Sequence, residues 1–441
     1  MPDKKNIFVF GLDPFHLEQA KCVRGAENYE FHGVLDHDEV VQPKKYDIAR
    51  MIEEADATLR DFGGTVDALI SHWDFPASTI QPIVCRRHGL RSASLEAVLK
   101  CEHKYWARVM QREAIPDLTP EFAAIDPFAD DPLEGIKVPY PFWVKPIKGF
   151  SSTLGYRIDK AEDFYEVLPT IRKNIRRLGE PFNEILRHAD LPDDIAKVDG
   201  NHMIAEQIIK GKQCGLEGYV HEGHVAIHII VDCVKDTENK SFTRYELPSH
   251  WPQRIRDRML EATKALMAHI GYDSQPFGIE FFWDDETDEI GVLEVNTRIS
   301  QSHSEQLIMT EGASNHQVAI DLALGRDPAY CRDEGRYKQA AKFLLRRYED
   351  AVVERVPSED EIQAVEERFP GCKVKISVNE GDRLSDLRDQ DSYSYECADI
   401  YMGAKDQNTL LENYQEAAHM LGFKFSDGGT FEDVQFEKKR F

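Results

Sequence analysis

Hydrophobic and polar residues alternate through the first hundred residues in a pattern typical of an α/β domain. Apolar runs at 6–12, 29–36, 66–73 and 90–94 predict strands, and helical spacing from Asp13, over 48–62 and over 76–88 predicts the helices between them. Such alternation predicts a small parallel sheet covered by helices. Gly11 follows the first strand without a GxxG run after it, so a dinucleotide-binding fingerprint is absent.

Beyond Ser94 the pattern changes to that of an α+β region. Ser94 is expected to cap one continuous helix that runs to residue 115. After a Pro-rich connection, an apolar strand ending at Lys145 enters a Gly/Ser loop and a second strand, which is a hairpin rather than the turn of a P-loop. The later elements are a charged helical stretch from 159 to about 196, strands at 202–209 and within 215–232, and a helix over 254–272 that stops at Gly271.

Residues 276–298 have the pattern of a β-hairpin that carries two acidic side chains. Side chains alternate along a strand, so Glu294, Asn296 and Arg298 share one face. If the acidic turn over 284–289 is symmetric, Glu280 lies opposite Glu294, at roughly 5 Å, where like charges repel. A divalent metal removes that penalty, and an oxygen-only ligand set suits Mg²⁺ better than Zn²⁺. The alternative is that both glutamates face solvent on a wet sheet.

The C-terminal part continues as α+β. A helix from His316 is closed by Gly325, and apolar runs at 340–348, 373–378 and 397–405 predict strands before a last helix over 412–423. The chain has neither an internal repeat nor a low-complexity segment.

Composition limits the class of protein. A chain of 441 residues with 41% hydrophobic content buries a large core and divides into two or three domains. Its 54 Lys plus Arg against 79 Asp plus Glu give a net charge of −25, which disfavours binding to nucleic acid. The eight cysteines form no CxxC pair, which favours reduced thiols. No apolar run approaches the roughly 20 residues of a membrane helix, so a cytoplasmic protein without a membrane partner is expected.

Two lysines and a loop have the chemistry of a phosphate site. Lys104 lies on the predicted helix, where a solvated lysine is the plainer interpretation, and Lys145 ends an apolar strand beside the loop, where a charge suits phosphate. Gly149, Ser151 and Ser152 offer backbone N–H groups and hydroxyls that can close on phosphate oxygens. An ordinary hairpin turn needs only a glycine or two.

The segment from Glu206 to Gln213 suits the rest of a nucleotide. Backbone groups of Gln207 and Ile209 can read an adenine edge, and Gln213 is in reach of ribose hydroxyls, although the segment also fits a generic edge strand. Arg298, beyond the acidic pair, is shaped to hold a carboxylate or acyl phosphate through two hydrogen bonds; a surface ion pair is the alternative. His16, His72 and Asp74 lie near predicted strand ends, where α/β sheets bind ligands.

These elements, in this order, resemble the ATP-grasp superfamily over roughly residues 95–330. The resemblance rests on Lys104, on VKPIKGFSS with Lys145, on EQII from Glu206 to Ile209, and on the paired GIEFF and LEVNTR. The flanking parts resemble that family's Rossmann-like preceding domain and its biotin-carboxylase-like C-terminal domain. The expected fold is therefore α/β and α+β, with a Rossmann-like domain at 1–97, an ATP-grasp domain at 98–330 whose lid covers about 140–208, and a C-terminal α+β domain at 331–441.

The resemblance also implies roles. Lys104 and Lys145 would bind the α- and β-phosphates of ATP, the loop with Gly149, Ser151 and Ser152 would cover the transferred phosphate, and Glu206, Gln207 and Ile209 would bind adenine. Gln213 would bind ribose, where many members carry a glutamate. The metal ligands would be Glu280, Glu294 and Asn296 for Mg²⁺, with Mn²⁺ as a substitute, and Arg298 and Lys145 would act in catalysis.

One departure from the family narrows the activity. EVNTRISQSH resembles the corresponding run of biotin carboxylases, but the glutamate that deprotonates bicarbonate there falls on Ser302, which cannot serve as that base. The expected activity is an ADP-forming ligase that joins a carboxylate, best matched by an amino acid, to an amine through an acyl phosphate. A carboxylase-type or formate-using enzyme and a non-catalytic nucleotide-binding protein remain as alternatives. The partners expected are the small carboxylate and amine, with a homodimer implied by the resemblance alone.

Overall fold

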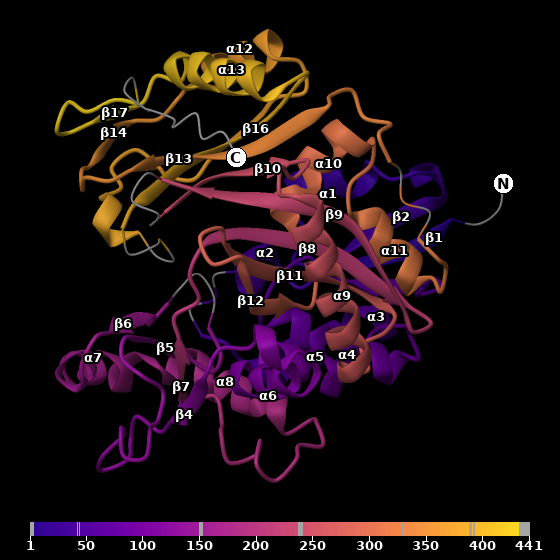
Figure 1. Cartoon of the computed structure of the whole chain (residues 1–441). Coiled ribbons are helices and arrows are strands. Elements are labelled where there is room, and N and C mark those ends of the chain that lie inside the picture. Colours follow the sequence, from indigo (N-terminus) through magenta and orange to yellow (C-terminus); the bar gives the residue numbers. More distant parts are fainter. Residues whose placement is uncertain are drawn as a thin grey trace. The chain divides into compact units, whose positions relative to one another are not determined.

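The computed structural model describes residues 4–41, 43, 45–149, 153–236, 241–328, 330, 332–387, 390 and 393–431. The chain forms two compact units, each assembled from separate stretches of sequence. The first unit contains Met1–Ile229, Gln253–Gln301 and His316–Ala329, and the second contains Ile230–Pro252, Ser302–Asn315 and Tyr330–Phe441. Both contain helices and sheets (Figure 1), which confirms the mixed α/β and α+β class. The predicted division at residues 97 and 330 stays a prediction.

The first unit begins with a three-stranded sheet in the order β2-β1-β3, and its strands are parallel, as the sequence predicts. Its elements are β1 (Lys5–Phe10), α1 (Pro14–Lys21), β2 (Tyr29–Val34), α2 (His37–Val41), α3 (Ile48–Arg60), β3 (Ala68–Ile70) and α4 (Ala77–His88). Phe8 and Phe10 pack with α3 and α4, whereas Ile7 and Val9 pack on the other face with α11 (His316–Ala323). Strand alternation therefore places helices on both faces of the sheet.

Two predictions about the following segment are wrong. Residues 90–94 form no strand, because their groups bond locally and to a side chain: Ala93 N donates to Gln275 Oε1 at 3.1 Å. The predicted continuous helix from Ser94 is two helices, α5 (Leu95–Glu102) and α6 (Lys104–Ala114). His103 interrupts them, because its extended backbone lets Nδ1 accept from Trp106 N at 3.2 Å while Nε2 bonds Val198 O at 2.6 Å. Ser94 does cap α5, accepting from Ala97 N.

The region predicted as the lid, about 140–208, contributes three strands to a four-stranded antiparallel sheet in the order β4-β7-β5-β6, and its role as a lid stays a prediction. The elements of this part of the chain are β4 (Phe122–Ile125), β5 (Phe142–Pro146), β6 (Tyr156–Ile158), α7 (Ala161–Asn174), α8 (Arg176–Leu186) and β7 (Met203–Gln207). The hairpin of β5 and β6 is confirmed, but β7 lies between β4 and β5 and is not the edge strand that its sequence also allowed. Side chains of α7 pack on this sheet, whereas α8 packs into the core of the first sheet.

The acidic hairpin consists of two strands, one of which pairs with a further strand of the first unit. β8 (Lys212–His221) pairs with β11 (Gln275–Asp284), which pairs with β12 (Glu289–Asn296), and α9 (Gln253–Ile270) precedes β11. Gly271, just after α9, has φ +72°, a left-handed conformation that suits glycine and ends the helix as predicted. β9 (His224–Lys235) follows β8 and crosses the boundary between the units at residue 229.

The second unit is built on an antiparallel sheet. Its strands, in spatial order, are the end of β9, β10 (Phe242–Leu247), β13 (Gln339–Arg347), β16 (Tyr395–Ala404) and β15 (Lys373–Ile376), and β14 (Val353–Arg355) pairs with β17 (Lys424–Phe425). Its helices are α10 (Ser304–Glu311), α12 (Glu359–Arg368) and α13 (Gln407–Met420). Phe343 stacks on Tyr414 at 3.9 Å between ring centroids, which joins β13 to α13. The three predicted C-terminal strands and the last helix are confirmed.

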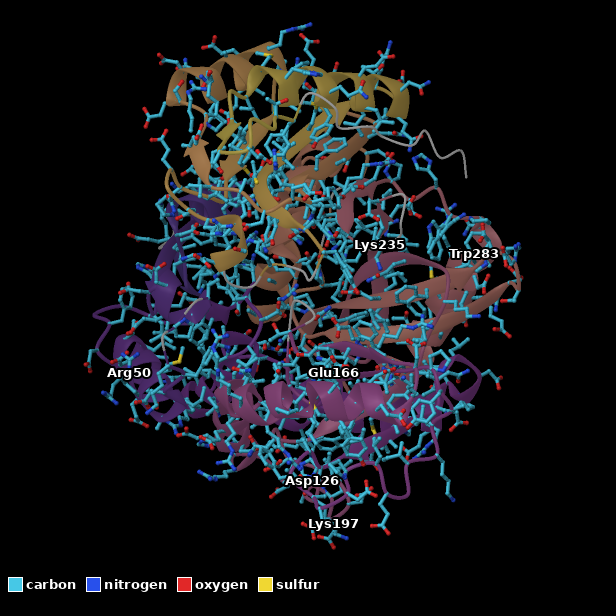
Figure 2. All side chains as sticks on the ribbon, turned by 90° about the vertical axis from the view of Figure 1, so that its left-hand side faces the viewer. Arg50, Asp126, Glu166, Lys197, Lys235 and Trp283 are labelled. Atoms are coloured by element: carbon cyan, nitrogen blue, oxygen red, sulfur yellow. The ribbon has the colours of Figure 1, made fainter. Side chains whose placement is uncertain are left out.

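Replacing Phe182 tests the anchorage of α8. Its ring is buried, with centroids 5.9 Å from both Phe75 and His103. Phe182→Ala should lower the free energy of unfolding by about 3–5 kcal/mol, the usual cost of emptying a buried aromatic site. Denaturant unfolding followed by circular dichroism measures this. Glu166→Ala on the exposed face of α7 (Figure 2) is the control and should change stability by less than about 0.5 kcal/mol; equal effects of the two changes would contradict this account of α8.

Candidate functional site

The two acidic residues of the hairpin face each other as predicted. Glu280 pairs directly with Glu294, and Gly278 pairs with Asn296 in the same register. A β-bulge between Glu280 and Phe281 then shifts the pairs nearer the turn by one residue, so the two strands of the hairpin are not symmetric about the turn. The bulge leaves the Glu280–Glu294 register intact. Two like charges therefore lie directly across neighbouring strands.

Amide groups surround the Glu280 carboxylate. Gln213 Nε2 donates to Glu280 Oε2 at 2.6 Å, and Asn296 Nδ2 donates to Oε1 at 3.3 Å. Burial and the neighbouring charge of Glu294 raise the pKa of Glu280 from 4.5 to about 7. Glu280 is thus not the fully solvated glutamate of the alternative interpretation. A glutamate at position 213 would add a third carboxylate here, which gives a physical reason for glutamine at that position.

Lys104 faces the other acidic residue. Its Nζ lies 3.8 Å from Glu294 Oε2 and donates to Gly149 O at 2.9 Å. Its backbone N–H also donates to Ile147 O at 3.2 Å, so the N-terminus of α6 holds the start of the Gly/Ser loop. Burial lowers the pKa of Lys104, although Glu294 opposes that effect. The break at His103 matters here, because it places Lys104 at the first position of α6.

Lys145 and Glu206 form an ion pair inside the lid. Lys145 Nζ lies 2.8 Å from Glu206 Oε2, and Arg108 Nε donates to Glu206 Oε1 at 2.7 Å. Burial works against the charged carboxylate, but the two cations outweigh it and lower the pKa of Glu206 to about 2. Arg108 also donates to Val292 O at 2.7 Å, which links the lid strand to β12. Arg108 was not among the predicted residues; its position four residues after Lys104, on the same helix face, is the signal that points to it.

The segment after β7 leaves backbone groups available. Gln207 N donates to Glu121 O at 2.8 Å, so this N–H is occupied. Within the part of the chain that the structure describes, neither backbone group of Ile209 has a hydrogen-bond partner, while its side chain packs against Gly291. Ile209 therefore has the free N–H and C=O that an adenine edge requires, and Gln207 does not offer its N–H. The predicted serines Ser151 and Ser152 lie outside the described residues.

A buried network that the sequence did not reveal connects the loop to the hairpin. Lys148 forms an ion pair with Glu102, and Thr297 Oγ1 donates to the other oxygen of Glu102 at 2.6 Å. The Lys148 ammonium also lies over the rings of Phe75 and Phe182, at 5.4 and 5.7 Å. Burial opposes ionisation of Glu102, but the Lys148 charge lowers its pKa overall. Glu102 thus joins the residue before Gly149 to the residue after Asn296.

Arg298 is held by an acidic residue from the first sheet. Its Nε and Nη2 donate to the two oxygens of Asp74 at 2.8 and 2.7 Å, and Nη1 donates to Ile299 O at 3.2 Å. Burial lowers the pKa of Arg298, but the Asp74 charge outweighs this and raises it, and Arg298 in turn lowers the pKa of Asp74 against the effect of burial. The structure thus brings Arg298 to the carboxyl end of β3.

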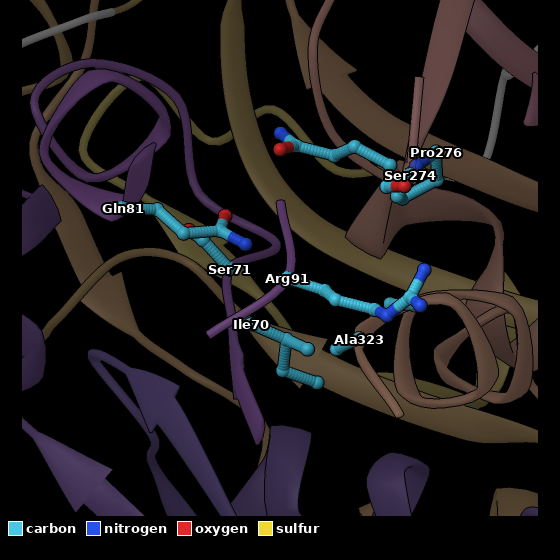
Figure 3. A pocket seen from close by; sticks show the side chains of 9 residues that line it. Ile70, Ser71, Gln81, Arg91, Ser274, Pro276 and Ala323 are labelled. Carbon is cyan, nitrogen blue, oxygen red and sulfur yellow. The ribbon is translucent and has the colours of Figure 1, made fainter. Parts of the chain in front are cut away.

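The predicted residues within the described ranges lie in the first unit, and a separate small pocket contains none of them. That pocket is shown in Figure 3 and is lined by Ile70, Ser71, Gln81, Arg91, Ser274, Gln275, Pro276, Ala319 and Ala323. Its Gln275 already accepts from Ala93 N and donates to Thr297 O at 2.6 Å. The pocket therefore adds nothing to the site.

The described residues contain no cluster of three or more His, Cys, Asp or Glu side chains arranged to hold a metal ion. No helix among them has both the length and the apolar character needed to cross a membrane. The seven cysteines that the structure describes are free thiols.

Comparison with protein families gives a match to the ATP-grasp domain. Residues 138–306 match the model of that domain. Comparison with curated protein sequences gives no significant match. The family match covers the lid hairpin, β7, β8 and the acidic hairpin, which are the elements that carry the resemblance noted from the sequence.

Solved structures extend the likeness over nearly the whole chain. An L-amino acid ligase from Bacillus licheniformis has a TM-score of 0.73 at 17% identity, over 97% of this chain and 100% of that one. The biotin carboxylase domain dimer of the 2-oxoglutarate carboxylase from Hydrogenobacter thermophilus, in complex with MgADP, ADP and bicarbonate, has a TM-score of 0.65 at 14% identity, over 96% and 92%. An N5-carboxyaminoimidazole synthase from Aspergillus clavatus, in complex with ADP and 5-aminoimidazole ribonucleotide, has a TM-score of 0.62 at 13% identity, over 95% and 99%.

Residues 138–306 therefore match an ATP-grasp domain, and the chain has the fold that these ligases and carboxylases share. The family match and the structural likeness confirm the resemblance that the sequence indicates. At these identities the structural likeness establishes the fold.

The raised pKa of Glu280 predicts that the free energy of unfolding decreases as the pH rises. Because its folded-state pKa of about 7 lies above 4.5, the folded protein keeps the proton longer than the unfolded chain, and stability falls as pH rises from about 4.5 through 7. Glu280→Gln removes this loss and should be more stable than the wild type at pH 8 by roughly 1–3 kcal/mol, with the gain shrinking toward pH 5. Denaturant unfolding in EDTA at both pH values measures the difference; parallel pH profiles for the two proteins would refute the assigned environment.

Removing the Arg108 side chain should lower the free energy of unfolding. Arg108→Met leaves the buried Glu206 carboxylate with Lys145 alone, and breaking a buried ion pair costs about 3–5 kcal/mol. The free energy of unfolding at pH 7 measures it. Arg157→Met is a matched control, because Arg157 pairs with Asp159 on the exposed lid surface and such pairs contribute under about 1 kcal/mol. A loss for Arg108→Met no larger than for the control would show that Arg108 is not needed to hold Glu206.

Proposed function

We propose that the protein is an ATP-dependent ligase that joins the carboxylate of an amino acid to an amine, releasing ADP and phosphate. The observation that carries the proposal is the direct opposition of Glu280 and Glu294, with the amides of Asn296 and Gln213 on Glu280 and the ammonium of Lys104 near Glu294. Two like charges held this close have no structural benefit of their own. Their position in an ATP-grasp domain supports a nucleotide and metal site.

The donor set fits Mg²⁺. Glu280, Glu294 and Asn296 offer only oxygen ligands, which Mg²⁺ and Mn²⁺ prefer. Burial and the charge of Glu294 raise the pKa of Glu280, and a dication bound here would favour the charged form of both carboxylates. A Mg²⁺ ion held by these residues would supply positive charge that neutralises the phosphates of the nucleotide. The MgADP in the Hydrogenobacter thermophilus structure supports ATP as the co-substrate.

The remaining residues are assigned to parts of the nucleotide. Lys145 bonds Glu206 through one N–H, and its two other donors have no partner among the described residues, so it can contact phosphate without releasing Glu206. Lys104 contributes a second charge. The backbone of Ile209 would bind adenine, with the C=O of Gln207 beside it, and Gln213 would bind ribose. Gly149, with Ser151 and Ser152, would cover the transferred phosphate.

The reaction proceeds in two substitutions. A carboxylate oxygen of the amino acid attacks the γ-phosphorus of ATP, the bond to the β-phosphate oxygen breaks, and ADP leaves. The amine nitrogen then attacks the acyl carbon, the bond to phosphate breaks, and the amine loses a proton as the amide forms. Arg298 would hold the acyl phosphate through its charged fork. The protein contributes position, charge and exclusion of water, and a covalent nucleophile is not required.

The carboxylase alternative has less support. Ser302, at the position of the bicarbonate base in the resembled family, lies in the 3₁₀ turn Gln301–His303, and its hydroxyl accepts from Lys342 Nζ at 3.4 Å. A serine hydroxyl is too weakly basic for that role. Bicarbonate-dependent ADP release without an amine would favour the carboxylase; ATP binding without turnover would favour a nucleotide-binding protein.

A pairwise assay tests the function. Amino acids and small carboxylates are combined with amines in the presence of ATP and Mg²⁺, and ADP and phosphate are measured with the amide product. ADP release that requires both a carboxylate and an amine, and that EDTA abolishes, is the expected result. Light scattering of the same sample tests the homodimer that the resemblance implies.

Lys145→Met should lower kcat by about 10²-fold or more, because it removes a preorganised charge that stabilises the transferring phosphate. Lys197→Met, at an exposed lysine of the lid region (Figure 2), is the control and should leave kcat unchanged. Retention of full activity in Lys145→Met would remove Lys145 from the site.

A further inference from the structure

The ion pair between Arg298 and Asp74 leaves two donors of the guanidinium open. A guanidinium has five N–H donors. Three are used, two by the oxygens of Asp74 and one by Ile299 O. One donor on Nη1 and one on Nη2 have no partner among the residues that the structure describes. These two N–H groups can bind an anionic oxygen group, such as a carboxylate or phosphate.

Asp74 holds the Arg298 guanidinium in place, and its own carboxylate is still accessible to solvent. Its side chain is 40% exposed, whereas that of Arg298 is 16% exposed. The aspartate follows β3 at the carboxyl end of the parallel sheet, where α/β sheets bind ligands. Each Asp74 oxygen accepts one hydrogen bond from Arg298, and carboxylate oxygens can accept a second. An exposed carboxylate thus lies beside the proposed acyl-phosphate site.

Neighbouring groups do not neutralise Asp74. His72 and His316 are buried and bonded to each other at 3.3 Å, and burial lowers the pKa of both, so they are neutral at pH 7. The two lysines whose charges reach Asp74 have carboxylates of their own: Lys148 pairs with Glu102, and Lys104 faces Glu294. Arg298 is therefore the main counter-charge of Asp74.

The negative charge of Asp74 therefore disfavours a substrate that carries a carboxylate alone and favours one that also carries an ammonium group. A substrate carboxylate that accepts from the remaining Nη2 donor of Arg298 at about 2.9 Å has its oxygen about 5 Å from the Asp74 oxygen on the same nitrogen. Two carboxylates would then share one guanidinium and repel each other. A substrate with an ammonium group next to its carboxylate removes this repulsion, because the ammonium can bond Asp74 while the carboxylate bonds Arg298.

We propose that Asp74 binds the α-ammonium group of the amino acid that is activated, and so selects amino acids over plain carboxylates as acyl donors. The inference rests on the proposed ligase function. It concerns the acyl donor rather than the attacking amine, since the attacking amine must lose a proton to react and a carboxylate that stabilises its ammonium form would slow that step.

The test compares each amino acid with its des-amino analogue, such as alanine with propanoate, as acyl donor to one fixed amine. In the wild type, kcat/KM should favour the amino acid by about 10- to 100-fold, the usual contribution of a charge-assisted hydrogen bond. Asp74→Asn keeps the size and one acceptor for Arg298 but loses the charge. It should reduce kcat/KM for the amino acid by about that factor and leave the value for the des-amino acid unchanged or higher.

Asp56→Asn is the matched control, because Asp56 also pairs with an arginine, Arg87, but lies on α3 in a separate contact. It should preserve the preference, and circular dichroism checks the fold of both variants. Equal loss for both acyl donors in Asp74→Asn, or a wild type that does not prefer the amino acid, overturns the inference while the ligase function stands. A wild type that forms no ADP with any pair overturns the proposed function instead, and the inference with it.

Discussion

The opposition of Glu280 and Glu294 across two strands is the constraint around which the first unit is arranged. The β-bulge beside Glu280 shifts the rest of the hairpin but keeps these two carboxylates in register. Their repulsion is moderated by amide donors on one side and by the Lys104 ammonium on the other. A dication with phosphate ligands would complete this arrangement, which supports an ATP site at the hairpin.

Buried ion pairs connect the segments around this hairpin to one another. Glu102 joins Thr297 at the end of the hairpin to Lys148 at the start of the loop, and Glu206 joins Lys145 of the lid to Arg108 of α6. Buried charges are tolerated only when paired, so each pair fixes the distance between two segments that are far apart in sequence. These buried pairs thereby hold the acidic hairpin, the Gly/Ser loop and strand β7 to neighbouring segments.

The ion pair between Arg298 and Asp74 connects the acidic hairpin to the parallel sheet. The pair orients the arginine and leaves two N–H donors of its guanidinium open beside an accessible carboxylate. One anion-binding and one cation-binding group at this spacing suit a zwitterion. With the role proposed for Asp74, the first sheet would take part in selecting the substrate.

The sequence by itself determined three features of this protein: the strand alternation of the first sheet, the hairpin with Glu280 opposite Glu294, and the ordered motifs that match an ATP-grasp domain. All three follow from the period and spacing of side chains along the chain. The sequence did not determine the break at His103, because that break depends on a bond to Val198, ninety-five residues away. Nor did it reveal the partners of Lys148, Arg108 and Arg298. Ion pairs form between side chains that only the folded chain brings together, so the tertiary structure decided which charges are committed to each other and which remain open to a substrate.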